Sequence, residues 1–179
     1  MSSESRTSNR ILGGLRSVGG KGVVRMEDRF DTDIEDLWAA LTEPRRLARW
    51  LGDFEGDLRV GGEFRAHFFS SGWVGRGRVE ACEPPHRFQV WTEEPGEPYD
   101  LVIEVWLTTE GKRTLFVAEE RGMPLRLLAA YGAGIQIHVE DLAGHIAGAE
   151  RDTREGRWNE LIPAYEAIAR KSSYDLGER

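Results

Sequence analysis

The sequence has little cysteine, no long apolar run and no excess of positive charge, and each of these absences narrows the class of protein. It contains one cysteine, Cys82, which excludes an internal disulfide framework. No apolar stretch approaches the roughly 18 residues that a membrane-spanning helix needs, and the N-terminus lacks the apolar core of a secretion signal. We therefore expect a cytoplasmic protein without a membrane span.

The charge balance argues against one large class of partner. The formal net charge is -7 at pH 7, whereas electrostatic binding of nucleic acid depends on clustered positive charge. We therefore expect no nucleic-acid partner. At 179 residues the chain is long enough for a single domain that buries its own core without disulfide bonds or a structural metal.

The longest periodic stretch of the sequence covers residues 131–149. Apolar side chains recur there at steps of four and three residues, which is the period of one face of an α-helix. The spacing predicts a long helix that becomes regular from about Ile135, with Gly148 as a suitable C-terminal stop. The residues of the apolar stripe are Ile135, Val139, Leu142, Ile146 and Ala149.

The part of the chain before this helix reads mainly as β-strands. Almost every connection between neighbouring segments is short enough for antiparallel pairing. Two short helices are expected after the first strand, over about 33–42, where Thr32 and Glu35 are spaced as a capping box, and from Pro44 to Leu51. The strands are expected over 23–30, 58–60, 63–68, 73–81, 88–92, 101–108 and 113–120.

Both ends of the chain lack this order. Residues 1–22 are rich in Ser, Gly and Arg without sustained periodicity, which predicts a flexible N-terminal arm. Residues 23–171 are expected to form one domain that includes a last amphipathic helix after Trp158. Residues 172–179 are expected to be a frayed tail.

The register of the last predicted hairpin decides which side chains point into the domain. A slip of one residue turns every side chain of a strand to the other face of its sheet. A loop of two residues would place Val105 opposite Phe116, and a loop of three residues would place it opposite Val117. The second option collects more apolar side chains on one face and is preferred. It turns Glu119 inward, with Arg121 as its candidate partner.

The order of one strand, two short helices, six antiparallel strands and a long C-terminal helix resembles the START-like helix-grip fold of the SRPBCC superfamily. Within it, the sequence is similar to the bacterial branch named after the activator of Hsp90 ATPase homologue. The matching segments are FDTDIEDLWAALTEPRRLARWLG (30–52), LRVGGEFR (58–65), SGWVGRGRVEACEPPHRF (71–88), Glu119 to Gly122, and YGAGIQIHVEDLAGHIAG (131–148).

This resemblance implies an α+β protein in which a seven-stranded antiparallel sheet wraps around the long C-terminal helix. It also implies a deep cavity between the sheet and the helix, which relatives use for lipids, hormones, polyketides or aromatic substrates. The chaperone activity belongs to a eukaryotic protein with an additional domain, so the family name is not transferred as an activity. We expect no cofactor.

Three side chains of the predicted long helix suggest a metal site, but their spacing weakens that interpretation. His138 and His145 are seven residues apart, roughly 10 Å along the axis at 1.5 Å per residue, which is too far to share one ion. Asp141 could share an ion with either histidine, but two ligands are not a site. We therefore expect no metal and interpret His138 as a histidine at a cavity rim or in a polar spot of its wall.

Trp38, Trp50 and Trp73, three of the six tryptophans, could simply fill a core, but with the resemblance to the helix-grip fold we interpret them as an aromatic lining at the mouth of a cavity, which suits an apolar or aromatic small molecule. Gly75 and Gly77 occupy consecutive positions on one face of a predicted strand, which indicates a bend or room for something to approach. The candidate ligand-binding residues are Trp38, Trp50, His67, Trp73, Glu119, Ile135, His138 and Leu142.

Three functions remain open from the sequence. The first is a non-enzymatic module that shelters a small hydrophobic or aromatic ligand, for which no catalytic residue is named. The second is an enzyme of the cyclase or hydratase type, in which His138 or Glu119 moves a proton. The third is an interaction or chaperone-associated module that forms a homodimer or binds a partner through an outer sheet face carrying Trp91 and Trp106.

Overall fold

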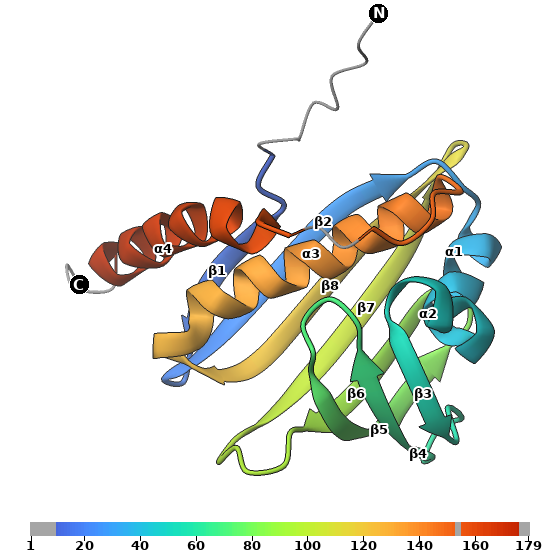
Figure 1. The fold of residues 1–179 in the computed structure, drawn as a ribbon, viewed down its shortest axis with the longest axis horizontal. Helices are drawn as coiled ribbons and strands as arrows, with labels where there is room; N and C mark the ends of the chain where they lie inside the picture. The colour runs from blue at the N-terminus through green and yellow to red at the C-terminus, as the bar shows by residue number, and fades with distance from the viewer. Residues whose placement is uncertain (1–9, 153–154, 176–179) are drawn as a thin grey trace, which may run out of the picture.

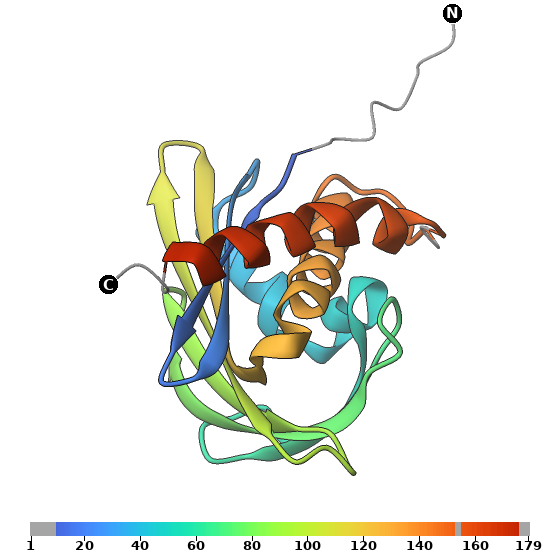
Figure 2. The same cartoon turned by 90° about the vertical axis from the view of Figure 1, so that its left-hand side faces the viewer.

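The computed structural model describes residues 10–152 and 155–175, and it contains one antiparallel sheet with the strand order β1-β2-β8-β7-β6-β5-β4-β3. The sheet curves around the long helix α3, and α4 crosses α3 and β1 (Figures 1 and 2). The helix-grip arrangement is thus confirmed, with eight strands in place of the predicted seven. The elements are β1 (Gly13–Val18), β2 (Lys21–Phe30), α1 (Ile34–Thr42), α2 (Pro44–Trp50), β3 (Gly52–Gly56), β4 (Glu63–Phe68), β5 (Val74–Glu83), β6 (Arg87–Glu93), β7 (Asp100–Glu110), β8 (Arg113–Pro124), η1 (Leu125–Leu127), α3 (Leu128–Ile146) and α4 (Arg157–Asp175).

The additional strand β1 lies in the segment predicted as a flexible arm. It pairs with β2 from Gly13 opposite Met26 to Val18 opposite Lys21. The prediction was wrong for residues 13–22 because only one of the six residues of β1 is buried, which leaves too weak an alternation to detect. The predicted arm also includes residues 1–9, which lie outside the described residues.

A buried polar cluster holds the start of β1 against the two C-terminal helices. The Tyr165 hydroxyl accepts a hydrogen bond from the backbone N–H of Gly13 at 3.0 Å and lies 2.5 Å from Oε1 of Gln136. Gln136 also accepts from the N–H of Leu12 and donates to the carbonyl of Arg10. These long-range bonds, rather than local propensity, order the N-terminal segment.

Two local predictions before β4 were wrong. Residues 58–60 do not form a strand, because the Asp57 carboxylate accepts from the N–H of Arg59 and turns the chain there; β3 pairs with β4 instead. The N-cap of α1 is Asp33, whose side chain accepts from the N–H of Asp36. An aspartate caps a helix as well as a Ser or Thr does, so the predicted capping box is not used.

Helix α3 begins about seven residues earlier than predicted and ends where predicted. Gly132 lies inside the helix, and the ring of Tyr165 packs against this position. After Ile146 the chain leaves the helix at Gly148, which has a φ of 80° and serves as the C-terminal stop.

Helix α4 continues to Asp175, so the predicted tail begins later than residue 172. None of the described helices is both long and apolar enough to cross a membrane.

The last hairpin adopts neither of the two predicted registers. Glu110 pairs with Arg113, which leaves a two-residue loop, and Val105 lies opposite Ala118. Gly111 has a φ of 62°, a conformation that a tight two-residue hairpin loop requires. The preferred three-residue loop was therefore wrong by one position.

This shift of the register by one residue turns each side chain of β8 to the opposite face from the one predicted. Phe116 is buried in the core, and Val117 lies opposite Trp106 on the outer side. Glu120 points toward α3, whereas Glu119 points away from it. The expectation that Glu119 lies inside the domain is thus corrected.

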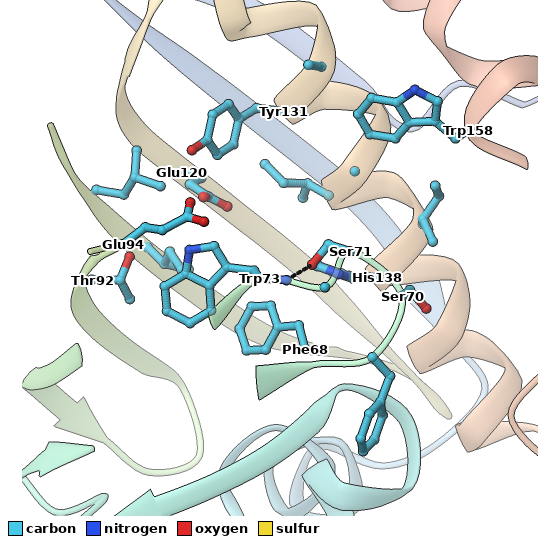
Figure 3. A pocket seen from close by; sticks show the side chains of 18 of the residues that line it. Phe68, Ser70, Ser71, Trp73, Thr92, Glu94, Glu120, Tyr131, His138 and Trp158 are labelled. Atoms are coloured by element: carbon cyan, nitrogen blue, oxygen red, sulfur yellow. Dashed lines mark hydrogen bonds between the residues drawn. The ribbon is translucent and has the colours of Figure 1, made fainter. Parts of the chain in front are cut away.

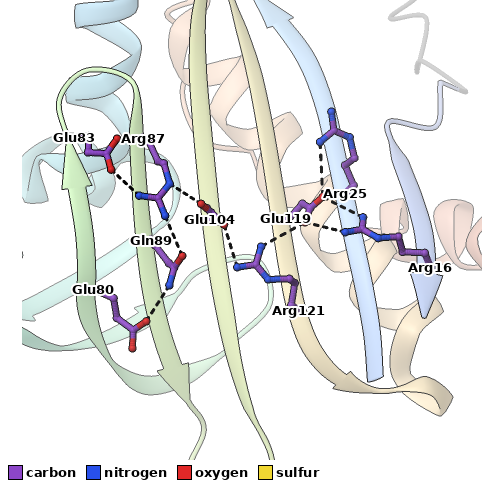
Figure 4. Close-up of polar contacts among 9 residues, drawn as sticks. All are labelled: Arg16, Arg25, Glu80, Glu83, Arg87, Gln89, Glu104, Glu119 and Arg121. Carbon is purple, nitrogen blue, oxygen red and sulfur yellow. Dashed lines mark hydrogen bonds and ion pairs between the residues drawn. The ribbon is translucent and has the colours of Figure 1, made fainter. Parts of the chain in front are cut away.

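Glu119 belongs to a network of ion pairs on the outer face of the sheet (Figure 4). Its carboxylate accepts from both terminal nitrogens of Arg16 at 3.1 Å and also bonds to Arg121. Arg121 and Arg87 flank Glu104, at 3.1 and 2.6 Å. These charges share the outer face with the predicted aromatic pair, Trp91 and Trp106.

The contact between α3 and α4 leads to a paired prediction. A Cβ added at Gly132 would lie 2.5 Å from Cδ1 of Tyr165, whereas one added at Gly144 of the same helix meets nothing within 4 Å. We expect Gly132→Ala to lower the free energy of unfolding by about 1 to 3 kcal/mol through overpacking. Gly144→Ala is expected to raise it by up to about 1 kcal/mol through helix propensity. Chemical denaturation of the two variants checks this, and equal effects would contradict the packing described.

Candidate functional site

A pocket of about 690 Å³ lies between the inner face of the sheet and the first half of α3 (Figure 3). A second space of about 200 Å³ adjoins it toward α2. The two have six lining residues in common, so we treat them as one site with two compartments. The shared residues are Phe68, Thr92, Ile103, Glu120, Ile135 and His138.

The glycines of β5 shape the floor of this site. A Cβ at Gly77 would lie 2.4 Å from Cζ of Phe64, and one at Gly75 would lie 2.3 Å from Cζ2 of Trp73. The space predicted at these glycines therefore exists, and aromatic rings of the same chain occupy it. Because the strand carries no side chains there, the rings can lie close to its backbone.

Aromatic rings form much of the remaining wall. The ring centroids of Phe68 and Trp73 are 4.8 Å apart, and the Phe68 ring meets the His138 ring edge to face at 5.3 Å. Trp158 lines the pocket from α4 and is 43% exposed. Aromatic packing of this kind provides a large apolar contact area with few rotatable bonds.

Glu120 is the unusual polar group of the site. Its carboxyl faces the pocket and makes no hydrogen bond or ion pair with any described residue, and burial raises the pKa of this carboxyl to about 7. Burial, and secondarily the charge of Glu97, also raises the pKa of Glu94, which lines the same pocket. With a pKa of about 7, the Glu120 carboxyl changes charge close to neutral pH.

Tyr131 approaches both carboxyl groups from α3. Its hydroxyl lies 2.8 Å from that of Tyr99. Burial, this hydrogen bond and the charges of Glu120 and Glu94 all raise the pKa of Tyr131. The tyrosine is therefore neutral at physiological pH and brings a hydroxyl and a ring face to the end of the pocket that holds the two acids.

His138 is the second polar group without a partner. Its Nε2 atom is buried and has no hydrogen-bond partner among the described residues. Burial lowers the pKa of His138 to about 4, so the imidazole is neutral at pH 7. A neutral imidazole can donate or accept one hydrogen bond at this nitrogen, depending on its tautomer.

Five of the eight sequence-predicted residues line the site. Three of them, Ile135, His138 and Leu142, come from α3, and Trp50 and Trp73 come from α2 and the turn before β5. Their role in binding remains a prediction.

The other three predicted residues lie elsewhere. Trp38 packs edge to face on Phe88 at 5.7 Å and lines neither compartment. His67 is exposed because it alternates away from Phe64 and Phe68 along β4. Glu119 lies on the outer face of the sheet, because the observed pairing of β7 with β8 turns it away from α3.

Sequence reasoning missed Glu120, Glu94, Thr92, Tyr131 and Trp158 as lining residues. Glu120 stands next to an identical residue in the sequence, and only the strand register tells the two apart. Trp158 was correctly predicted to lie in an amphipathic helix, but no local sequence pattern indicates that its side chain lines the pocket.

The three side chains considered for a metal engage different partners. Asp141 accepts a hydrogen bond from the Ser70 hydroxyl at 2.6 Å. Nε2 of His145 accepts from Nε of Arg46 at 2.9 Å, while His138 faces the pocket. Within residues 10–152 and 155–175, no group of three or more His, Cys, Asp or Glu side chains could hold a metal ion.

Comparison with solved structures places this fold among bacterial proteins. The crystal structure of CalU16 from Micromonospora echinospora is 28% identical, with a TM-score of 0.74, covering 88% of this chain and 95% of that chain. Protein MLL2253 from Mesorhizobium loti is 23% identical, with a TM-score of 0.64, covering 72% of this chain and 99% of that one.

A further similar structure is DynU16, a protein of the dynemicin biosynthetic locus. It is 24% identical with a TM-score of 0.66, and the match covers 72% of this chain and 48% of that chain. No functionally curated protein matches the sequence. A family model described as Activator of Hsp90 ATPase homolog 1-like protein matches residues 31–147, which is more than half of the chain. The chain therefore belongs to the Activator of Hsp90 ATPase homolog 1-like family of the START-like superfamily.

Proposed function

We propose that the protein binds a small, largely apolar or aromatic molecule in the two-compartment site between α3 and the sheet. The observation that carries this proposal is a mainly apolar space of about 690 Å³ that contains two polar side chains without partners, Glu120 and His138. Ligand pockets typically span about 300 to 1,000 Å³ and combine apolar walls with a few oriented polar groups.

The energetic cost of Glu120 supports this proposal. Relative to its ordinary value of 4.5, a pKa of about 7 corresponds to about 3 kcal/mol of lost stability once the group is ionised, at about 1.4 kcal/mol per pKa unit. A half-buried carboxyl without a partner thus opposes folding when it is ionised. Such a group has a use when a ligand supplies the missing partner.

The same carboxyl favours one alternative, proton-transfer catalysis. A general acid or base works best when its pKa lies near the operating pH, and Glu120 meets this condition where the sequence had suggested Glu119. A cyclase- or hydratase-type enzyme would lose turnover in Glu120→Gln and keep its affinity for the substrate. A binding protein without catalytic activity would show no turnover in either the wild type or this variant.

Native mass spectrometry of the protein purified from its own host would test the proposal directly. A bound mass that organic extraction removes would reveal a ligand and allow it to be identified. A protein that carries no such mass and also binds no apolar probe would contradict the proposed function.

Filling the site with a larger side chain should weaken probe binding. Ile135 lines both compartments, so Ile135→Trp is expected to weaken binding of the fluorescent apolar probe N-phenyl-naphthylamine about tenfold or more, equivalent to about 1.4 kcal/mol. Gly144→Phe adds an aromatic side chain to the same helix at a position with open space around it and should bind the probe like the wild type. Equal titration curves for Ile135→Trp and the wild type would place the probe elsewhere.

The two adjacent glutamates should have opposite effects on stability. The raised pKa of Glu120 means that its folded-state penalty is absent below about pH 4.5, grows as the pH rises through about 7 and is complete above it. Glu120→Gln is therefore expected to unfold at higher denaturant concentration than the wild type at pH 8, with the difference shrinking at pH 5.

Glu119 serves as the matched control. Its hydrogen bond with Arg16 lowers the pKa of its carboxyl, so it adds stability above its ordinary pKa and loses it as the pH falls through the lowered value. Glu119→Gln should therefore be less stable than the wild type at pH 8. Loss of stability in both variants at pH 8 would contradict the assigned register.

A further inference from the structure

We infer that the ligand carries an organic cation, a protonated amine or a quaternary ammonium group, which binds at the end of the pocket formed by Glu94, Glu120, Trp73 and Tyr131. This inference rests on the proposed function and adds the chemical class of the ligand. It combines two carboxyl groups that have no cationic partner with two aromatic rings in one partly enclosed space.

Four separate parts of the chain bring these side chains together. Glu94 follows β6, Glu120 lies on β8, Tyr131 lies on α3, and Trp73 precedes β5. Figure 3 shows the four side chains directed into the same end of the pocket. The charges of both carboxylates act on the Tyr131 hydroxyl, which places the two acids near the same group.

No positive charge of the described chain balances this end. Glu94 and Glu120 form no ion pair or side-chain hydrogen bond with another described residue. The pocket lining contains one basic side chain, Arg151, whose guanidinium lies 4.2 Å from the centroid of the Phe69 ring. The remaining charged lining residues, Asp152 and Glu155, are also acidic.

This arrangement discriminates between classes of ligand. An anion would meet like charge, and a hydrocarbon would leave the half-buried carboxyl of Glu120 without a partner. A cation gains charge attraction from Glu120 and Glu94, and it gains further from the faces of aromatic rings. The apolar remainder of such a ligand would pack against the wall formed by Phe68 and Ile135.

The ionisation of the site makes this preference dependent on pH. Glu120 titrates near pH 7, and a bound cation favours its charged form, so cation affinity should rise from pH 6 to pH 8. The other titratable groups do not reverse this trend: the lowered pKa of His138 and the raised pKa of Tyr131 keep both neutral in this range. Glu94, whose pKa is also raised by burial, adds negative charge in the same direction as it ionises, and the other charged groups of the lining are Arg151, Asp152 and Glu155.

A matched pair of probes tests the inference. The first is naphthylpropyl trimethylammonium, and the second is the hydrocarbon in which carbon replaces the nitrogen, so that the two share one shape and differ in charge. Affinities are measured by naphthalene fluorescence at pH 6 and pH 8 for the wild type, Glu120→Gln and Glu119→Gln. The last variant removes an equal charge on the outer face of the same strand.

We expect the cation to bind the wild type and Glu119→Gln about ten- to hundredfold more tightly than the hydrocarbon at pH 8, the range of an interaction with a charged group. In Glu120→Gln the preference for the cation should fall to the smaller part that Glu94 and the aromatic rings supply, while hydrocarbon binding stays unchanged and reports an intact pocket. Equal affinities in the wild type, or a preference as large in Glu120→Gln as in the wild type, would overturn the inference and leave the proposed function standing. Failure of both probes to bind the wild type would overturn both.

Discussion

The pairing of β7 with β8 is the constraint on which the interior of this protein depends. With Val105 opposite Ala118, Phe116 enters the core and Glu120 faces α3. The opposite face of the same strand then presents Glu119 to the arginines of β1, β2 and β8. Because side chains alternate strictly along a strand, the position of Glu120 in the pocket and the ionic network of the outer surface follow from one register.

Two groups of buried polar atoms in this structure have different meanings. Gln136 and Tyr165 are almost fully buried, and they bond to each other and to the backbone near Gly13. That cluster is complete, so it stabilises the junction of β1, α3 and α4. Nε2 of His138 is buried and the half-buried carboxyl of Glu120 faces the pocket, both without partners among the described residues, and an incomplete polar site inside an apolar wall is the property expected of a binding site.

The curved sheet and the helix it surrounds explain why the site is open at all. Gly75 and Gly77 let the rings of Trp73 and Phe64 lie close to the backbone of β5, which keeps bulky groups away from the space beside α3. Family membership accounts for this architecture, while the chemistry of the site comes from particular side chains placed within it. A cationic and aromatic ligand is therefore a hypothesis about this chain, and it does not follow from the fold.

Local patterns in the sequence determined the helices and the general architecture, because the periodicity of α3, the glycine after it and the prolines are signals carried by neighbouring residues. The order of elements was sufficient to indicate the helix-grip fold and five lining residues, among them Trp73 and His138. Only the tertiary structure decided that β1 joins the sheet, since long-range hydrogen bonds to Gln136 and Tyr165 hold its start. It also decided between Glu119 and Glu120: two identical neighbours have no local difference, and a strand's register is set by the partner across the ladder.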